Sequence, residues 1–302
     1  MLEIKSLLIA IRPRHWSKNL LVFVVPFLAF ALDISVWISS IKIFLVFNLI
    51  SSSIYLLNDC IDFESDRLHP IKKYRPIASG NLSRKKGLLF SIALFIFSIY
   101  FASKINTYLF LVILIYYIIQ ILYCLILKNK PILDIFCVAS GFLLRSIAGG
   151  IGVDLFISPW FLLSIGLLAI FLCLEKRKAE LRLFETNGVL TRNVLKKYSM
   201  PLLLRYENIL TTGSFLTYAL WASGPTLNGS SSKWMLLTVP LVLMGIFRYQ
   251  LLSDPFLSNN REKKLTKISS ENPVNILFND NFIKFLILIW IISIIFISAL
   301  TG

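Results

Sequence analysis

Residues 58–80, NDCIDFESDRLHPIKKYRPIASG, combine carboxylates, basic side chains and a histidine in a chain that is otherwise rich in apolar residues. Asp59, Asp62 and Asp66 follow one another with i, i+3 and i+7 spacing. On an α-helix this spacing places all three side chains on one face, within roughly 60° of each other. Because like charges on one face repel, the pattern predicts a bound cation, and clustered carboxylate oxygens suit Mg²⁺ or Mn²⁺.

The basic residues that follow the aspartates indicate what this cation would accompany. Mg²⁺ in proteins commonly binds one or two carboxylates together with phosphate oxygens of a substrate. Lys72 and Arg75 can contact non-bridging phosphate oxygens, and Asn58 directly precedes the first aspartate. We therefore expect a metal and phosphate site here, with Pro70 ending the helix that carries the aspartates. The alternative is a solvated loop beside the membrane with incidental salt bridges.

The elements that must position this stretch are apolar. Of the 302 residues, 57% are hydrophobic and 16% are charged, and the mean hydropathy is +0.76. A soluble domain has about 45–50% apolar and about 25% charged residues, so the composition indicates an integral membrane protein. The net charge of +15 then favours basic cytoplasmic loops over nucleic-acid binding, and we expect no nucleic-acid partner.

The apolar runs predict an all-α protein with nine transmembrane helices, because a helix needs about 20 apolar residues to cross the hydrocarbon core. Lys and Arg gather at the N-terminus and in residues 58–86, 175–207 and 251–281. The positive-inside rule therefore places the N-terminus and these loops in the cytoplasm and the C-terminus outside. The membrane that we expect is the inner (cytoplasmic) membrane. The expected spans are 19–32, 36–57, 87–103, 106–127, 131–152, 158–174, 208–224, 233–250 and 282–300.

The sequence NDCIDFESD resembles the first aspartate-rich motif, NDxxDxxxD, of the UbiA superfamily of intramembrane prenyltransferases. This resemblance implies a single domain, residues 1–302, with nine helices around a central cavity that opens to the cytoplasm. It also implies two acidic cytoplasmic motifs that bind Mg²⁺ and diphosphate. In this chain Asp59, Asp62 and Asp66 would be the catalytic metal ligands of the first motif.

The second charged segment, CLEKRKAELRLFE at 173–185, separates two branches of this superfamily. Members that prenylate aromatic acceptors carry a second aspartate-rich motif, whereas this segment contains no aspartate. Lys176, Arg177 and Glu180 resemble instead the KRxxEL segment of the decaprenyl-phosphate phosphoribosyltransferase branch. Three further stretches carry the same resemblance, namely RPRHWSKNLLVFVVP at 12–26, LKNKPILDIFCVASGFLLRSIAGGI at 127–151 and ENPVNILFNDNF at 271–282.

The resemblance to this branch implies transfer of 5-phosphoribose from phosphoribosyl diphosphate to a polyprenyl phosphate, such as decaprenyl phosphate. Mg²⁺, or Mn²⁺ in its place, would neutralise the leaving diphosphate, and the product would supply arabinose-type sugars of the cell envelope. One alternative is an aromatic prenyltransferase that joins a polyprenyl diphosphate to a 4-hydroxybenzoate-like acceptor. A transporter or lipid-binding membrane protein without catalytic activity is the other. The sequence determines neither the polyprenyl length nor the oligomeric state, and it allows a homo-oligomer.

The roles of the second segment stay open at the level of sequence. Lys176 and Arg177 are expected to bind either the 5-phosphate of the donor or the phosphate of the lipid. Glu180 could ligate metal, bind a ribose hydroxyl or orient Arg177, to which it stands in i, i+3 relation.

Four further residues, three of them outside the two charged stretches, also have alternative interpretations. Arg14 and Lys18, one helical turn apart, are expected to meet the polyprenyl phosphate or to anchor the chain at the lipid surface. Arg145 lies inside an expected span, where a charge is costly, so it would meet a substrate phosphate or pair with an acid such as Asp134. His69 could act as an acid or base, or end a helix.

Overall fold

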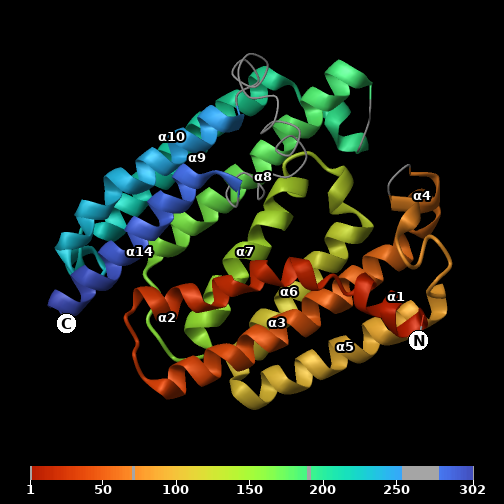
Figure 1. Cartoon of the computed structure of the whole chain (residues 1–302), viewed down its shortest axis with the longest axis horizontal. Helices are drawn as coiled ribbons and strands as arrows, with labels where there is room; N and C mark the ends of the chain where they lie inside the picture. Colours follow the sequence, from red (N-terminus) through yellow and green to blue (C-terminus); the bar gives the residue numbers. More distant parts are fainter. Residues whose placement is uncertain (1, 70–71, 189–191, 254–278, 302) are drawn as a thin grey trace. The chain divides into compact units, whose positions relative to one another are not determined.

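The computed structural model describes residues 2–69, 72–188, 192–253 and 279–301, and the regular elements in these ranges are all helices (Figure 1). The predicted all-α class is confirmed for this part of the chain. The chain forms two compact units, and helix α7 (Leu133–Ile151) contributes residues to both. The first unit consists of Met1–Phe27, Ala31–Lys128 and Leu144–Phe156, and the second of Leu28–Phe30, Asn129–Leu143 and Ile157–Gly302.

The first unit is built around the long helix α3 (Ile34–Ile61), which packs along α5 (Arg84–Ile105). Ser53 and Ser91 each donate a hydroxyl hydrogen bond to the other's backbone carbonyl, at 2.7 and 2.8 Å. Such small polar residues allow two helix backbones to approach closely inside a membrane. The other elements lying wholly or mainly in this unit are α1 (Leu2–Ala10), η1 (Pro13–Phe23), α2 (Val24–Leu28), α4 (Phe63–Leu68), η2 (Lys72–Tyr74), α6 (Thr107–Leu125) and η3 (Leu127–Asn129).

The segment that precedes α3 runs antiparallel to it (Figure 1). Trp16 donates to Ser52 near one end of α3, and the Phe23 ring stacks on Trp37 near the other end. Because a 3-10 helix rises about 2.0 Å per residue, the 11 residues of η1 and the five of α2 together extend about 30 Å. That length matches the hydrocarbon core of a bilayer, about 30 Å.

The second unit is built around another antiparallel pair, α8 (Pro159–Asn187) and α9 (Met200–Ala222). Lys178 pairs with Glu207 near one end, and the rings of Phe161 and Trp221 lie 6.0 Å apart near the other. The fully buried side chains of this unit include Phe171, Leu174, Leu195 and Leu203. Its other elements are η4 (Asn193–Lys197), η5 (Pro225–Leu227), η6 (Lys233–Thr238), α10 (Val239–Ser253) and α14 (Asn281–Thr301).

Seven of the helical segments in the described ranges are long and apolar enough to cross a membrane, and each coincides with one of the nine expected spans. The expected span 19–32 instead contains the last five residues of η1 and all of α2, because Pro26 lacks a backbone donor and Asn19 is held by polar partners. The expected span 208–224 begins within the 23-residue helix α9 and ends two residues beyond it; this helix is long enough to cross but more polar. The seven segments are α3, α5, α6, α7, residues 159–186 of α8, η6 with α10, and α14.

Helices α3 and α8 are longer than a membrane crossing requires. Their 28 and 29 residues extend over about 40 Å at roughly 1.5 Å per residue, against about 30 Å of hydrocarbon. The two charged stretches are carried at or directly after the C-terminal ends of these two helices. The chain therefore brings each stretch to the border of the apolar region on a rigid support.

Candidate active site

The aspartates of the first stretch are carried by two consecutive helices. Helix α3 ends at Ile61, and Asp62, with φ −83° and ψ 7°, joins it to α4. The Asp62 carbonyl accepts the backbone N–H of Asp66 at 2.8 Å. Helix α4 ends at Leu68, whereas the predicted stop residue Pro70 lies outside the described residues. The prediction of one continuous helix is thus wrong at Asp62, where the chain changes direction.

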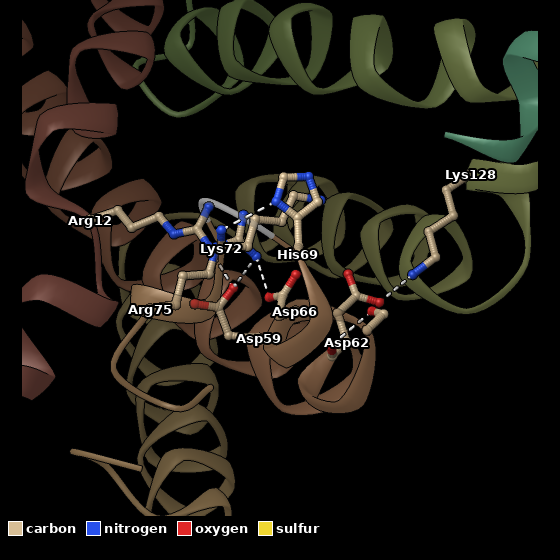
Figure 2. A network of polar contacts seen from close by, with 9 residues as sticks. Arg12, Asp59, Asp62, Asp66, His69, Lys72, Arg75 and Lys128 are labelled. Atoms are coloured by element: carbon tan, nitrogen blue, oxygen red, sulfur yellow. Dashed lines mark hydrogen bonds and ion pairs between the residues drawn. The ribbon is translucent and has the colours of Figure 1, made fainter. Parts of the chain in front are cut away.

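Asp59 and Asp66 converge on one cationic side chain, as Figure 2 shows. Arg75 donates from Nη1 to Asp59 Oδ1 at 3.2 Å and to Asp66 Oδ2 at 2.6 Å. Arg12, from the turn before η1, donates from Nη2 to the same oxygen of Asp59. The side chains of both aspartates are only 2% and 3% exposed, whereas those of the two arginines are about one-quarter exposed. Two buried carboxylates thus meet basic groups that remain accessible.

Asp62 is paired separately. Its Oδ1 accepts a hydrogen bond from Lys128 Nζ at 2.5 Å, and Figure 2 shows this lysine approaching from the side away from Arg12. Within the described ranges, no group of three His, Cys, Asp or Glu side chains is arranged to hold one metal ion. The assignment of all three aspartates to a metal therefore stays a prediction. Arg12 and Lys128 join the cluster, a contact with the aspartates that the sequence did not predict for either residue.

The neighbouring polar residues frame this cluster. His69 Nδ1 accepts the backbone N–H of Lys72 at 3.3 Å, which suits a neutral imidazole. Burial and the nearby positive charge of Lys72 lower the pKa of His69. Burial raises the pKa of Asp66 above its usual value, although Arg75 acts in the opposite direction. Asn58 is half-buried in the last turn of α3, where its carbonyl accepts the Asp62 N–H at 2.9 Å.

Arg14 and Lys18 do not share a helix face. Both lie in η1, a 3-10 helix with three residues per turn, so residues four apart are rotated by about 120°. Arg14 is exposed and Lys18 is half-buried. The prediction that they lie one above the other is therefore wrong, and Arg12 is the basic residue of this segment that reaches the aspartates.

The second unit holds Arg177 in a buried ionic network. Arg177 donates from Nε to Asp134 Oδ2 at 2.6 Å and from Nη1 to Glu180 Oε2 at 2.7 Å. Tyr198 donates to the other oxygen of Asp134 at 2.7 Å. Asp134 has no exposed surface, and Arg177 is 3% exposed. Asp134 is thus engaged by Arg177 and Tyr198, and of the roles considered for Glu180 the contact supports orientation of Arg177.

The other charged residues of this segment differ in their surroundings. Lys176 is half-buried and forms no ion pair with the residues that the structure describes. Arg192 lies beside the segment, with Nε 3.5 Å from Glu180 Oε2 and about one-third of its side chain exposed. Lys178 turns away to pair with Glu175 at 2.7 Å and with Glu207 of α9. Lys176 and Arg192 are therefore the candidates at this segment for contact with a ligand.

Arg145 is buried in the first unit, where it donates hydrogen bonds to uncharged side chains. It donates to Asn19 Oδ1 at 2.6 Å, to the Tyr116 hydroxyl at 2.9 Å and to Ser51 Oγ at 3.3 Å. Its guanidinium also lies over the Phe47 ring, 5.6 Å from the centroid. These contacts join α7 to η1, α3 and α6. They anchor this part of α7 within the first unit, and Asp134, the acid expected as a partner of Arg145, is bound by Arg177 and Tyr198.

Comparison with known proteins gives consistent results over nearly the whole chain. The sequence model of the UbiA prenyltransferase family matches residues 20–270. A decaprenyl-phosphate phosphoribosyltransferase of Mycolicibacterium smegmatis is 33% identical over 300 residues, which cover 95% of this chain and 91% of that protein. A protein of the same name from Corynebacterium glutamicum is 36% identical over 247 residues, covering 80% of this chain and 74% of that protein.

The fold is also similar to that of a solved structure. A UbiA homolog from Archaeoglobus fulgidus, determined bound to DMAPP and Mg²⁺, superimposes with a TM-score of 0.69. The match covers 96% of this chain and 98% of that chain at 18% sequence identity. At this identity the likeness concerns the fold.

Proposed function

This chain belongs to the UbiA prenyltransferase family, and we propose that it is an integral membrane transferase that moves 5-phosphoribose from phosphoribosyl diphosphate to a polyprenyl phosphate. An oxygen of the lipid phosphate would form the new bond to the anomeric carbon of the ribose. The bond between that carbon and the diphosphate would break, and the diphosphate would leave with the bonding electrons. The product would be a polyprenyl-phosphoryl-5-phosphoribose.

The observation that carries the choice of donor is the basic character of the second segment. An aromatic acceptor has no phosphate, whereas the proposed donor carries a 5-phosphate and the proposed acceptor carries a lipid phosphate. Lys176 and Arg192 would bind one of these groups, and Arg177 is held by Asp134 and Glu180. The two phosphoribosyltransferase relatives, similar over most of the chain, support the same choice.

The three aspartates Asp59, Asp62 and Asp66 with their basic partners, called the first cluster from here on, suit a divalent metal. Asp59 and Asp66 already direct one oxygen each to a single cationic atom, Arg75 Nη1, and oxygen ligands of this kind are those that Mg²⁺ prefers. Asp59 and Asp66, with Asp62 beside them, would hold Mg²⁺, and Mn²⁺ could replace it. The metal, when bound, would neutralise the charge that develops on the leaving diphosphate. The A. fulgidus homolog, whose structure was determined with Mg²⁺ bound, supports this assignment.

The basic groups around the aspartates would orient the donor. Arg75, Arg12, Lys72 and Lys128 lie around the carboxylates, where they can donate charge-assisted hydrogen bonds to the diphosphate. Asn58 would add a neutral polar contact beside them. Because the acceptor phosphate is already anionic, no strong general base is required. His69, whose pKa is lowered, would stay neutral near pH 7 and serve as a hydrogen-bonding group.

The acceptor lipid would approach from the membrane. Arg14, which is exposed, and Lys18 belong to η1, the segment that runs along α3, and would meet the lipid phosphate at the membrane surface. The basic loops favour nine crossings of one domain, residues 1–302, with the N-terminus and a central cavity on the cytoplasmic side of the inner membrane. The lengths of η1 with α2 and of α9 support the two crossings beyond the seven apolar segments.

Transfer of label tests this proposal. Purified protein would be incubated with ribose-labelled phosphoribosyl diphosphate, polyprenyl phosphate and Mg²⁺, and the lipid extract would be counted. We expect labelled lipid in amounts that rise with time, and none after the metal is removed with EDTA. Absence of labelled lipid at every metal concentration would contradict the proposed activity. Labelled lipid that forms equally well in excess EDTA would contradict the metal requirement alone.

A further inference from the structure

Arg75 contacts both of the buried carboxylates that the proposed function assigns to a metal. Its Nη1 atom donates to Asp59 Oδ1 at 3.2 Å and to Asp66 Oδ2 at 2.6 Å, and Arg12 donates to the same Asp59 oxygen. The aspartate side chains are 2% and 3% exposed, while that of Arg75 is 26% exposed. The arginine is therefore the partner with space to change its contacts, whereas the carboxylates are fixed by burial.

A divalent metal that binds between Asp59 Oδ1 and Asp66 Oδ2 takes the position that Arg75 Nη1 occupies. Mg²⁺ requires its oxygen ligands at about 2.0–2.1 Å, which leaves no place for an N–H donor between them. Two cations at such short separation also repel each other strongly where the surroundings are partly buried. A metal in this position would therefore displace Arg75, and the displaced charge would then need a new partner.

A diphosphate supplies that partner. A guanidinium binds phosphate oxygens through charge-assisted hydrogen bonds, commonly two at a time. A diphosphate that shares the metal would lie next to the carboxylates, within reach of the displaced side chain. Lys128 likewise pairs with Asp62, with its Nζ atom 2.5 Å from Asp62 Oδ1. Each aspartate of the cluster thus has a basic partner that phosphate oxygens can attract.

We propose that Arg75 is a placeholder cation that makes the binding of a divalent metal and of a diphosphate depend on each other, an inference that rests on the metal assignment of the proposed function. Metal alone must break two ion pairs of Arg75 without replacement. Metal that arrives with a diphosphate exchanges these ion pairs for contacts to phosphate. Because coupling between two ligands is reciprocal, each of them tightens the binding of the other.

Binding of Mn²⁺ alone tests this role in the full-length protein in detergent. The electron paramagnetic resonance signal of free Mn²⁺ falls as the ion binds, so affinity is measured without substrate or turnover. We expect Arg75→Gln to bind Mn²⁺ at least about tenfold more tightly than wild type, because the competing charge is gone. Arg75→Lys keeps the charge and should stay near wild type. Arg12→Gln should give a smaller gain, since Arg12 contacts Asp59 alone.

Lys85→Gln is the matched control, because it removes the same charge from an exposed position of the same unit and should leave the affinity unchanged. The placeholder role is wrong if Arg75→Gln binds Mn²⁺ no more tightly than wild type. If Arg75→Gln fails to fold, an Mn²⁺ affinity of Arg12→Gln equal to that of the wild type would also contradict the placeholder role. Asp66→Asn added to Arg75→Gln tests the metal assignment separately. Undiminished Mn²⁺ binding in that double variant would show that the metal binds elsewhere.

Discussion

The three aspartates of the first cluster have different surroundings. Asp59 and Asp66 are buried and share Arg75, whereas Asp62, at the junction of α3 and α4, is 22% exposed and pairs with Lys128. A side chain at a helix junction does not follow the rotation of a continuous helix. The two buried carboxylates are therefore the ones that we expect to be essential for metal binding.

Asp59→Asn and Asp66→Asn should each lower turnover by about 100-fold or more, because an amide cannot replace a charged metal ligand. Burial raises the pKa of Asp66, so the folded protein favours its neutral form more than the unfolded chain does. Asp66→Asn thus removes a charge that burial disfavours, and the unfolding temperature of this variant should not fall below that of the wild type. Initial rates and thermal unfolding measure the two effects.

Glu64→Gln serves as the control for these variants, because Glu64 is an exposed carboxylate of the same stretch. It should retain most of the wild-type rate. Full turnover in both aspartate variants would instead favour a solvated loop with incidental salt bridges.

The helices that depend on local hydropathy were predicted from the sequence. The features that depend on contacts between residues far apart in the chain were not. Seven expected spans coincide with apolar helices, since hydropathy alone sets them. The 3-10 form of η1 could not be predicted, because Asn19 is drawn to Asn48 at 2.6 Å and to Arg145, 126 residues away. Spacing likewise could not show that Arg177 pairs with Asp134, 43 residues before it.

The contact between α7, α8 and η4 in the second unit yields a prediction about stability. Asp134→Asn removes one of the two carboxylates that pair with buried Arg177, leaving Glu180, and should cost at most about 3–5 kcal/mol. Tyr198→Phe removes a neutral donor and should cost about 1–3 kcal/mol. Unfolding of the purified variants in detergent gives these values. The combination Asp134→Asn with Arg177→Met should be less destabilised than Asp134→Asn alone, because the buried guanidinium is gone and Glu180 keeps Arg192 as a partner.

Lys196→Met, at an exposed position of η4, controls for general effects of substitution in this region and should leave stability unchanged. Equal stability of Asp134→Asn and wild type would show that the ion pair with Arg177 contributes nothing to the fold.

For the whole molecule, the proposed activity requires both charged stretches to face the cytoplasm. Nine crossings satisfy this requirement, whereas omission of the segment η1–α2 would place residues 58–86 on the side opposite to the N-terminus. The length of about 30 Å for η1 with α2 favours the crossing.

Cysteine labelling in right-side-out membrane vesicles distinguishes the two arrangements. Ser65→Cys and Asp33→Cys introduce thiols at exposed positions near opposite ends of α3. A maleimide that cannot cross the membrane should label Asp33→Cys and leave Ser65→Cys unlabelled until the vesicles are opened. The reverse pattern would place the aspartate cluster outside and would be incompatible with a cytoplasmic donor.

The most direct test of the proposed function is a choice between two donors in one reaction. Protein in lipid vesicles with Mg²⁺ would receive phosphoribosyl diphosphate with polyprenyl phosphate, and polyprenyl diphosphate with 4-hydroxybenzoate, each donor carrying its own label. Mass spectrometry of the lipid extract would identify the products. We expect polyprenyl-phosphoryl-5-phosphoribose and no prenylated aromatic acid, because the second segment is basic and lacks aspartate. Prenylated hydroxybenzoate without the phosphoribosyl lipid would contradict the proposal.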